Sequence, residues 1–210
     1  MSQIIPAILT DDPKVFEQQL RQVEGLTNIV HLDISDGIFV PQKTITVDDI
    51  RNIKTKIQFA IHLMVQNPSA EIEKWYNFPN IRRIVFHFEA AKIPMAIIEH
   101  IESYGFKAGV ALNPETTLED LGGADYQADL VLFMAVHPGQ QGQSFLPETW
   151  EKIKAFKKKH PQTPLAVDGG IHEAELKQLL ALGVDYIVMG SEIFNHPKPG
   201  ERLKELQKYV

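Results

Sequence analysis

The sequence contains no cysteine. A disulfide framework, a thiolate nucleophile and a cysteine-ligated zinc site are therefore excluded, so any bound metal must be held by His, Asp or Glu. The absence of cysteine also agrees with a location in the cytoplasm, where thiols are kept reduced.

Long apolar runs and blocks of like charge are also absent. No cationic region precedes the apolar stretch at residues 4–9, which is too short for the core of a signal peptide, and residues 130–136 are too few to span a bilayer. The net charge is -6 and the basic cluster at residues 157–159 is short, so neither nucleic acid nor a membrane is an expected partner.

The chain does contain the balance of an ordinary globular protein, with 44% hydrophobic and 23% charged residues in a length of 210. That length can bury one sizeable core. Because no linker, low-complexity stretch or shift in composition divides the chain, we expect one domain over residues 1–210.

Short apolar stretches alternate with segments of helical periodicity along the whole chain. Strands are predicted at residues 4–9, 28–34, 59–64, 83–87, 107–112, 130–136, 165–167 and 186–189. Helices are predicted at residues 13–23, 47–53, 69–77, 94–104, 118–121, 147–160, 173–182 and 199–209, the first of them opened by Asp12 as cap and Pro13. Eight strands each followed by a helix are typical of the α/β class and of a closed (β/α)8 TIM barrel, although a doubly wound open sheet with extra strands gives a similar pattern.

The second predicted strand carries two ligand-type side chains into a turn. His31 and Asp33 are two residues apart, so on a strand they leave the same face side by side. They stand just before the turn at Asp36 and Gly37, at the end of the strand where a parallel α/β protein keeps its chemistry. The alternative is a strand-end His and Asp that only make local hydrogen bonds.

Two further side chains of the same kind lie at predicted strand ends. His62 is on the third strand and Asp168 ends the seventh, so a closed barrel would bring them to the mouth that holds His31 and Asp33. Two His and two Asp could form a site for one divalent ion such as Zn²⁺, Fe²⁺, Mn²⁺ or Co²⁺. Alone, His62 would more often be a core histidine. Asp33 and Asp168 would face each other across the mouth, as removal of a proton from one face of a substrate and its return to the other requires.

Glycines follow the last three predicted strands. They are Gly139, Gly142, Gly169, Gly170 and Gly190. Bare backbone N–H groups at such turns can hold a phosphate dianion without lysines, although each glycine taken alone is more often a plain turn residue.

These residues belong to a set of motifs that spans almost the whole chain. The motifs are IPAIL at 5–9, HLD, DG and FVP within 31–41, HLM at 62–64, KAG at 107–109, NP at 113–114, PG and GQSF within 138–145, VDGG at 167–170 and GSEIF at 190–194. Through them the chain resembles the ribulose-phosphate 3-epimerase family. The resemblance implies a TIM barrel and one divalent metal ion held by His31, Asp33, His62 and Asp168, with Asp33 and Asp168 as the catalytic acid/base pair.

The same resemblance implies the substrate. It is a phosphorylated ketose, with D-ribulose 5-phosphate epimerised at C3 to D-xylulose 5-phosphate through an enediolate, a step of the pentose phosphate pathway. The resemblance leaves assembly into a homo-oligomer open. Contacts with substrate or phosphate are implied for Ala7, Met64, Met134, Gly139, Gln140, Gln141, Gly142, Gly169, Gly170, Gly190 and Ser191.

The chain departs from the usual family pattern at four places. Ala7 stands where a serine is usual, Ser35 replaces a methionine, His137 an asparagine, and Gln140-Gln141 a more apolar pair. We expect His137 either to contact the substrate or only to brace the loop before Pro138. The departures leave open a 3-epimerase of another ketose phosphate, such as D-allulose 6-phosphate, and a non-catalytic sugar-phosphate-binding barrel. A related decarboxylase would carry a lysine near Asp33, which is missing.

Overall fold

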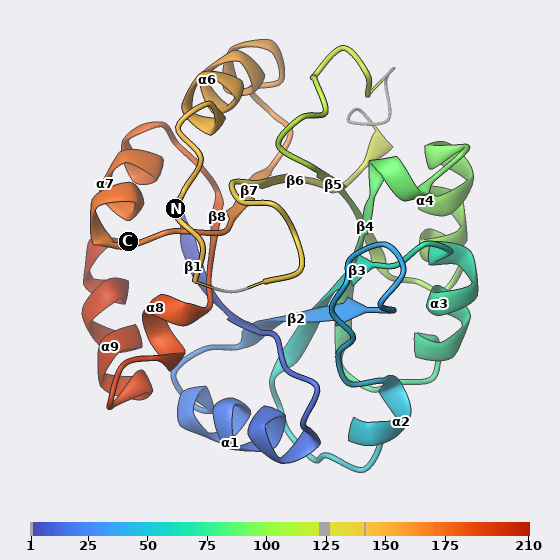
Figure 1. Ribbon diagram of the computed structural model, residues 1–210, viewed down its shortest axis with the longest axis vertical. Coiled ribbons are helices and arrows are strands. Elements are labelled where there is room, and N and C mark those ends of the chain that lie inside the picture. Colours follow the sequence, from blue (N-terminus) through green and yellow to red (C-terminus); the bar gives the residue numbers. More distant parts are fainter. Residues whose placement is uncertain (1, 122–126, 141) are drawn as a thin grey trace.

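The computed structural model describes residues 2–121, 127–140 and 142–210 and contains one closed parallel barrel (Figure 1). Its strands follow one another around the ring in sequence order, and the first pairs with the last. They are β1 (Gln3–Ile8), β2 (Ile29–Ser35), β3 (Gln58–Met64), β4 (Ile81–His87), β5 (Lys107–Leu112), β6 (Leu130–Met134), β7 (Leu165–Asp168) and β8 (Tyr186–Met189). The predicted (β/α)8 TIM barrel is confirmed, and the open sheet is excluded.

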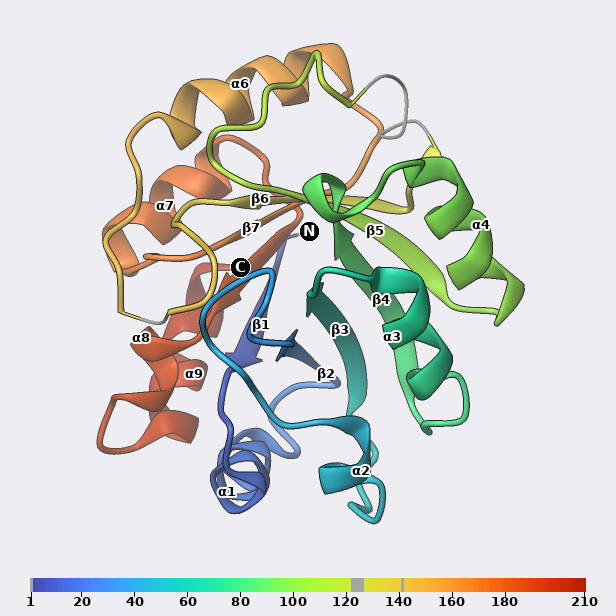
Figure 2. The ribbon, with the colours of Figure 1, turned by 45° about the vertical axis from the view of Figure 1, so that its right-hand side comes forward.

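Helices surround the barrel on the outside (Figure 2). They are α1 (Pro13–Val23), α2 (Val47–Ile50), α3 (Pro68–Trp75), α4 (Pro94–Ser103), α6 (Thr149–Lys159), α7 (Glu173–Ala181), α8 (Ser191–Phe194) and α9 (Pro199–Leu206), with short 3₁₀ turns at η1 (Phe88–Ala90) and η2 (Gln207–Tyr209). Four of them begin with proline, whose fixed φ suits the first helical position and whose missing N–H costs nothing there. None of the helices in the described ranges is both long and apolar enough to cross a membrane.

Residues 118–121 form turns, so the helix predicted there is wrong. The side chain of Asp120 accepts hydrogen bonds from the backbone N–H and the hydroxyl of Thr117, both at 2.8 Å. Such local bonds give the backbone an alternative to a helix.

The strands separate two apolar clusters because their side chains alternate between the two faces of the sheet. Ile4, Ile8 and Leu32 belong to the outer cluster, between the strands and the helices. Ala7 and Ile29 belong to the inner cluster, which fills the barrel. Since His31 and Asp33 are spaced by two from Ile29, they continue its inward face toward the end of β2. The same alternation that builds the core therefore places polar side chains at the mouth.

Candidate active site

The four residues predicted as metal ligands meet at the mouth of the barrel. In the register of β2 and β3, Asp33 lies opposite His62, and His31 stands two residues before Asp33 on the same face. Asp168 is the last residue of β7. One nitrogen or oxygen atom from each of the four side chains lies within 4.8 Å of the others. Strand register therefore brings together residues that are up to 137 positions apart, from 31 to 168.

Contacts within this cluster are short and buried. His62 Nδ1 lies 2.8 Å from Asp33 Oδ1, and His31 Nε2 lies 3.2 Å from Asp33 Oδ1 and 3.8 Å from Asp168 Oδ2. His31 Nε2 is buried and has no hydrogen-bond partner among the described residues. A buried nitrogen left unpaired costs about 1–3 kcal/mol. The two imidazole nitrogens and two carboxylate oxygens that converge here form a set of donors that fits a divalent transition metal.

The two carboxyl groups differ in proton affinity. Burial raises the pKa of Asp168, and the neighbouring Asp33 charge raises it further, to about 7. Burial acts in the same direction on Asp33, but the charge of His31 and the hydrogen bond from His62 outweigh it, so the pKa of Asp33 falls well below its usual value. Without a bound cation, Asp33 is thus the ionised carboxylate and Asp168 the group that can carry a proton near neutrality.

The two histidines also differ. Burial lowers the pKa of His62 to about 4, which keeps its ring neutral and able to act as a ligand. Burial lowers the pKa of His31 too, but the charge of Asp33 acts against burial and the net shift is upward.

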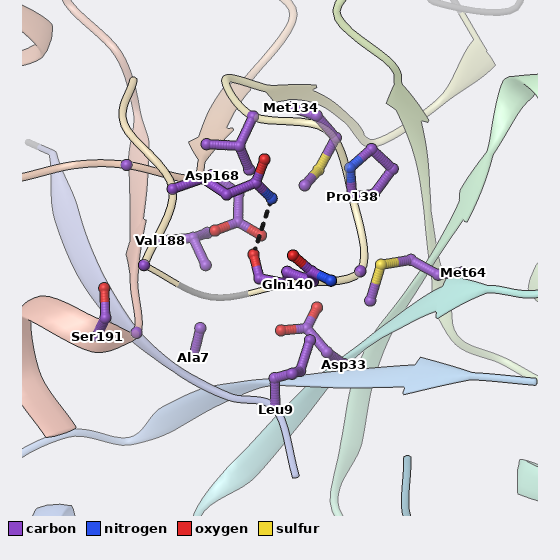
Figure 3. Close-up of a pocket in the computed structure, with 17 residues that line it drawn as sticks. Ala7, Leu9, Asp33, Met64, Met134, Pro138, Gln140, Asp168, Val188 and Ser191 are labelled. Carbon is purple, nitrogen blue, oxygen red and sulfur yellow. Dashed lines mark hydrogen bonds between the residues drawn. The ribbon is translucent and has the colours of Figure 1, made fainter. Parts of the chain in front are cut away.

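A pocket opens above the cluster, at the carboxyl ends of the strands (Figure 3). Figure 3 shows Asp33 and Asp168 entering it from different elements, with Met64 and Met134 beside them. Its lining includes every residue predicted to contact substrate or phosphate that the structure describes, namely Ala7, Met64, Met134, Gly139, Gln140, Gly142, Gly169, Gly170, Gly190 and Ser191. Gln141, also predicted, lies outside the described residues.

The loops after β6 and β7 come into close backbone contact at Gly170. Gly170 has φ +64, and a Cβ placed there would lie 2.2 Å from the backbone nitrogen of Phe145. Only glycine allows both this conformation and this approach, so the loop presents bare backbone to the pocket.

Departures from the usual family pattern fall at different depths. Ala7 lines the pocket with a methyl group. The Ser35 hydroxyl is buried with no hydrogen-bond partner within the described part of the chain, and neither Ser35 nor His137 is among the described lining residues. His137 Nδ1 lies 3.0 Å from Glu115 Oε1, with the two side chains 64% and 65% exposed. That pairing agrees with the expectation that His137 braces the loop.

Sequence reasoning missed several residues of this region. Leu9, Val136, Pro138, Gln143 and Val188 line the pocket, and Gln143 Nε2 donates a 3.0 Å hydrogen bond to the Gln140 carbonyl. Behind the cluster of His and Asp side chains, the buried ring of His87 contacts His62. The available signal for His87 was its place at the end of a predicted strand.

Comparisons with known proteins agree with this geometry. The model of the Ribulose-phosphate 3 epimerase family matches residues 3–194. The "Ribulose-phosphate 3-epimerase, cytoplasmic isoform" of Oryza sativa subsp. japonica is 35% identical, over 100% of this chain and 94% of its own length. The "Ribulose-phosphate 3-epimerase" of Aquifex aeolicus is 33% identical, over 92% of this chain and 90% of its own.

Solved structures support the fold. An orotidine 5'-phosphate decarboxylase from Pyrococcus horikoshii has a TM-score of 0.66 at 14% identity, covering 99% of each chain. An N-acetylmannosamine-6-phosphate 2-epimerase from Clostridium perfringens has a TM-score of 0.64 at 17% identity, covering 99% of this chain and 92% of its own. With the family match over residues 3–194 and relatives above 30% identity, this chain belongs to the ribulose-phosphate 3-epimerase family and is an isomerase of the epimerase type.

Proposed function

We propose that the protein interconverts D-ribulose 5-phosphate and D-xylulose 5-phosphate at C3, in the pentose phosphate pathway and with a divalent metal ion. The observation that carries this proposal is the convergence of Asp33 and Asp168 with two histidines below a glycine-lined pocket. The printed names of the rice and Aquifex relatives support the substrate, and the name of the rice isoform supports a cytoplasmic location. We also propose that residues 1–210 act as one domain.

Asp33 and Asp168 would share the proton transfers. The low pKa of Asp33 leaves an ionised carboxylate that can accept the C3 proton from one face of the sugar. Asp168 lines the same pocket and would deliver a proton to the other face. An enediolate lies between the two transfers, and the roles exchange in the reverse reaction.

The metal would be held by His31 Nε2, His62 Nδ1 and one carboxylate oxygen each from Asp33 and Asp168, which are the atoms that already converge. Zn²⁺, Fe²⁺, Mn²⁺ and Co²⁺ all accept this set of ligands. When bound, such an ion supplies Lewis-acid stabilisation of the charge that develops on the sugar oxygens, worth several kcal/mol.

The phosphate would lie at the rim of the same pocket. Gly139, Gly142, Gly169, Gly170 and Gly190 line it from the loops after β6, β7 and β8, where backbone N–H groups can face an anion. This arrangement suits a protein of net charge -6, because it requires no cluster of lysines.

A 3-epimerase of D-allulose 6-phosphate is the second candidate. Ala7 favours it, since a methyl group lines the pocket where the family usually has a serine hydroxyl.

Turnover of both ketose phosphates, measured with and without a chelator, tests the proposal. We expect a higher kcat/KM for D-ribulose 5-phosphate and loss of activity with the chelator. A preference for D-allulose 6-phosphate would establish the second candidate, and no turnover of either would favour a sugar-phosphate-binding protein.

A further inference from the structure

A chain of buried side chains continues outward from the metal cluster. His62 Nε2 lies 3.0 Å from His87 Nε2, and His87 Nδ1 lies 3.3 Å from Glu89 Oε2. Both rings are completely buried and are stacked with centroids 5.0 Å apart. Glu89 is fixed in turn, because its Oε1 accepts a 2.8 Å hydrogen bond from the backbone N–H of Asn113 and another from the Thr116 hydroxyl.

With a metal bound to His62 and Asp33, the direction of each hydrogen bond between His62 and Glu89 follows from the Glu89 carboxylate at the outer end. Burial acts to raise the pKa of Glu89, but hydrogen bonds from His87 and Thr116 outweigh it and the net shift is downward, so Glu89 is ionised and can only accept. His87 therefore carries its proton on Nδ1, and its Nε2 is left as an acceptor. In the metal-free protein His62 Nδ1 lies 2.8 Å from Asp33 Oδ1 and donates its proton to that carboxylate. Once a cation takes the place of this proton, His62 carries its proton on Nε2 and directs the lone pair of Nδ1 at the metal.

The geometry points to His87 and Glu89 as positioning residues that fix the tautomer of His62 in which Nδ1 is free to bind the metal. This inference rests on the proposed metal-dependent function. Metal-binding histidines depend on such outer partners, whose loss typically weakens metal affinity about 10- to 100-fold. Glu89 acts here through a second imidazole, because the ring of His87 lies between it and His62.

Glu89→Gln is the sharpest test, because glutamine has nearly the same shape as glutamate but should reverse the direction of the hydrogen bonds between residue 89, His87 and His62. The backbone N–H of Asn113 is a donor, so it holds the carbonyl of a glutamine at position 89 toward itself and turns the amide nitrogen toward His87. That nitrogen donates to His87 Nδ1 and moves the ring proton to Nε2. His62 must then accept at Nε2 and carry its proton on Nδ1, the atom that the metal needs.

Two further variants separate the tautomer from simple packing. His87→Gln can accept from His62 through its carbonyl and donate to Glu89 through its amide, so it should bind metal like the wild type. Glu71→Gln is the matched control, since Glu71 is also a buried carboxylate and accepts a 3.0 Å hydrogen bond from Trp75 Nε1 on the outside of the barrel.

We would titrate metal-stripped protein with Co²⁺, follow its visible absorption, and record thermal melting of each variant. Glu89→Gln should bind Co²⁺ about 10- to 100-fold more weakly than the wild type, while His87→Gln and Glu71→Gln stay close to it. Nitrogen-15 NMR of the zinc-loaded wild type should show the His87 proton on Nδ1, with the signals assigned from His87→Gln.

Folded Glu89→Gln with wild-type affinity for Co²⁺ would overturn the inference and leave the metal proposal intact. Wild-type protein that binds neither Co²⁺ nor Zn²⁺ would instead overturn the proposed metal dependence. If Glu89→Gln does not fold, the NMR measurement on the wild type decides, because a proton on His87 Nε2 contradicts the chain of hydrogen bonds.

Discussion

Asp33 and His62 lie opposite each other in the register of β2 and β3, and their side chains meet at 2.8 Å between Oδ1 and Nδ1. One hydrogen-bonded pair of neighbouring strands therefore supplies three of the four residues of the proposed metal site, namely His31, Asp33 and His62. Because both side chains face into the barrel, the site is as rigid as the sheet that carries it.

Asp33→Asn and Asp168→Asn should each reduce epimerisation by 10² to 10⁴-fold, or roughly 3–5 kcal/mol of barrier, because each removes one of two proton-transfer groups. In deuterated water the wild type should place deuterium at C3 of the product. Each variant should still exchange the C3 proton of one epimer, and the two should favour opposite epimers. The variants lose a proposed metal ligand, so metal content must be measured alongside. Wild-type product without solvent label would contradict the two-base mechanism.

Removal of metal should abolish turnover and lower the melting temperature, because an ion that binds only the folded state stabilises it. Zn²⁺, Mn²⁺, Fe²⁺ or Co²⁺ should restore both, with binding checked by elemental analysis. His31→Gln should prevent this recovery, whereas the exposed His196→Gln serves as control. Full activity in protein shown to be metal-free would refute the proposed dependence.

Gly170→Ala should unfold at lower denaturant and raise KM, because a Cβ would lie 2.2 Å from the Phe145 backbone nitrogen in the loop proposed to hold phosphate. Gly25→Ala is the matched control, with φ +80 and no described atom within 4 Å. Its free energy of unfolding should fall only by the cost of placing alanine in left-handed backbone, about 1–2 kcal/mol. Equal losses of unfolding free energy in the two variants would show that the loop at Phe145 can move away from the added methyl group.

Asp36 should stabilise the protein in a way that fades in acid. Burial raises its pKa, but backbone hydrogen bonds from Gln66, Phe39 and Ile38 outweigh this, and the folded-state pKa is lowered. The stabilisation is therefore complete above the unfolded pKa of about 3.9 and is lost as the pH falls through the lower folded value. Urea unfolding should show a larger penalty for Asp36→Asn at neutral pH than in strong acid. A penalty independent of pH would contradict this.

The sequence alone determined much of the architecture and which four residues meet at the centre of the candidate site. Alternation of apolar strands with helical segments predicts the barrel, because each period reflects a geometry fixed by the local backbone. The two-residue spacing of His31 and Asp33 likewise fixes their common face. Closure of the barrel then makes the joining of these residues with His62 and Asp168 a consequence of strand order, and the structure confirms that convergence.

Tertiary structure decided what depends on contacts between distant loops. The exposed pairing of His137 with Glu115 and the entry of Leu9 and Gln143 into the pocket follow from loop paths that no periodicity encodes. The chain from His62 through His87 to Glu89 needs strand register, ring orientation and burial together. A local sequence pattern predicts from which face of a strand a side chain projects, but packing in three dimensions sets which partner it contacts there.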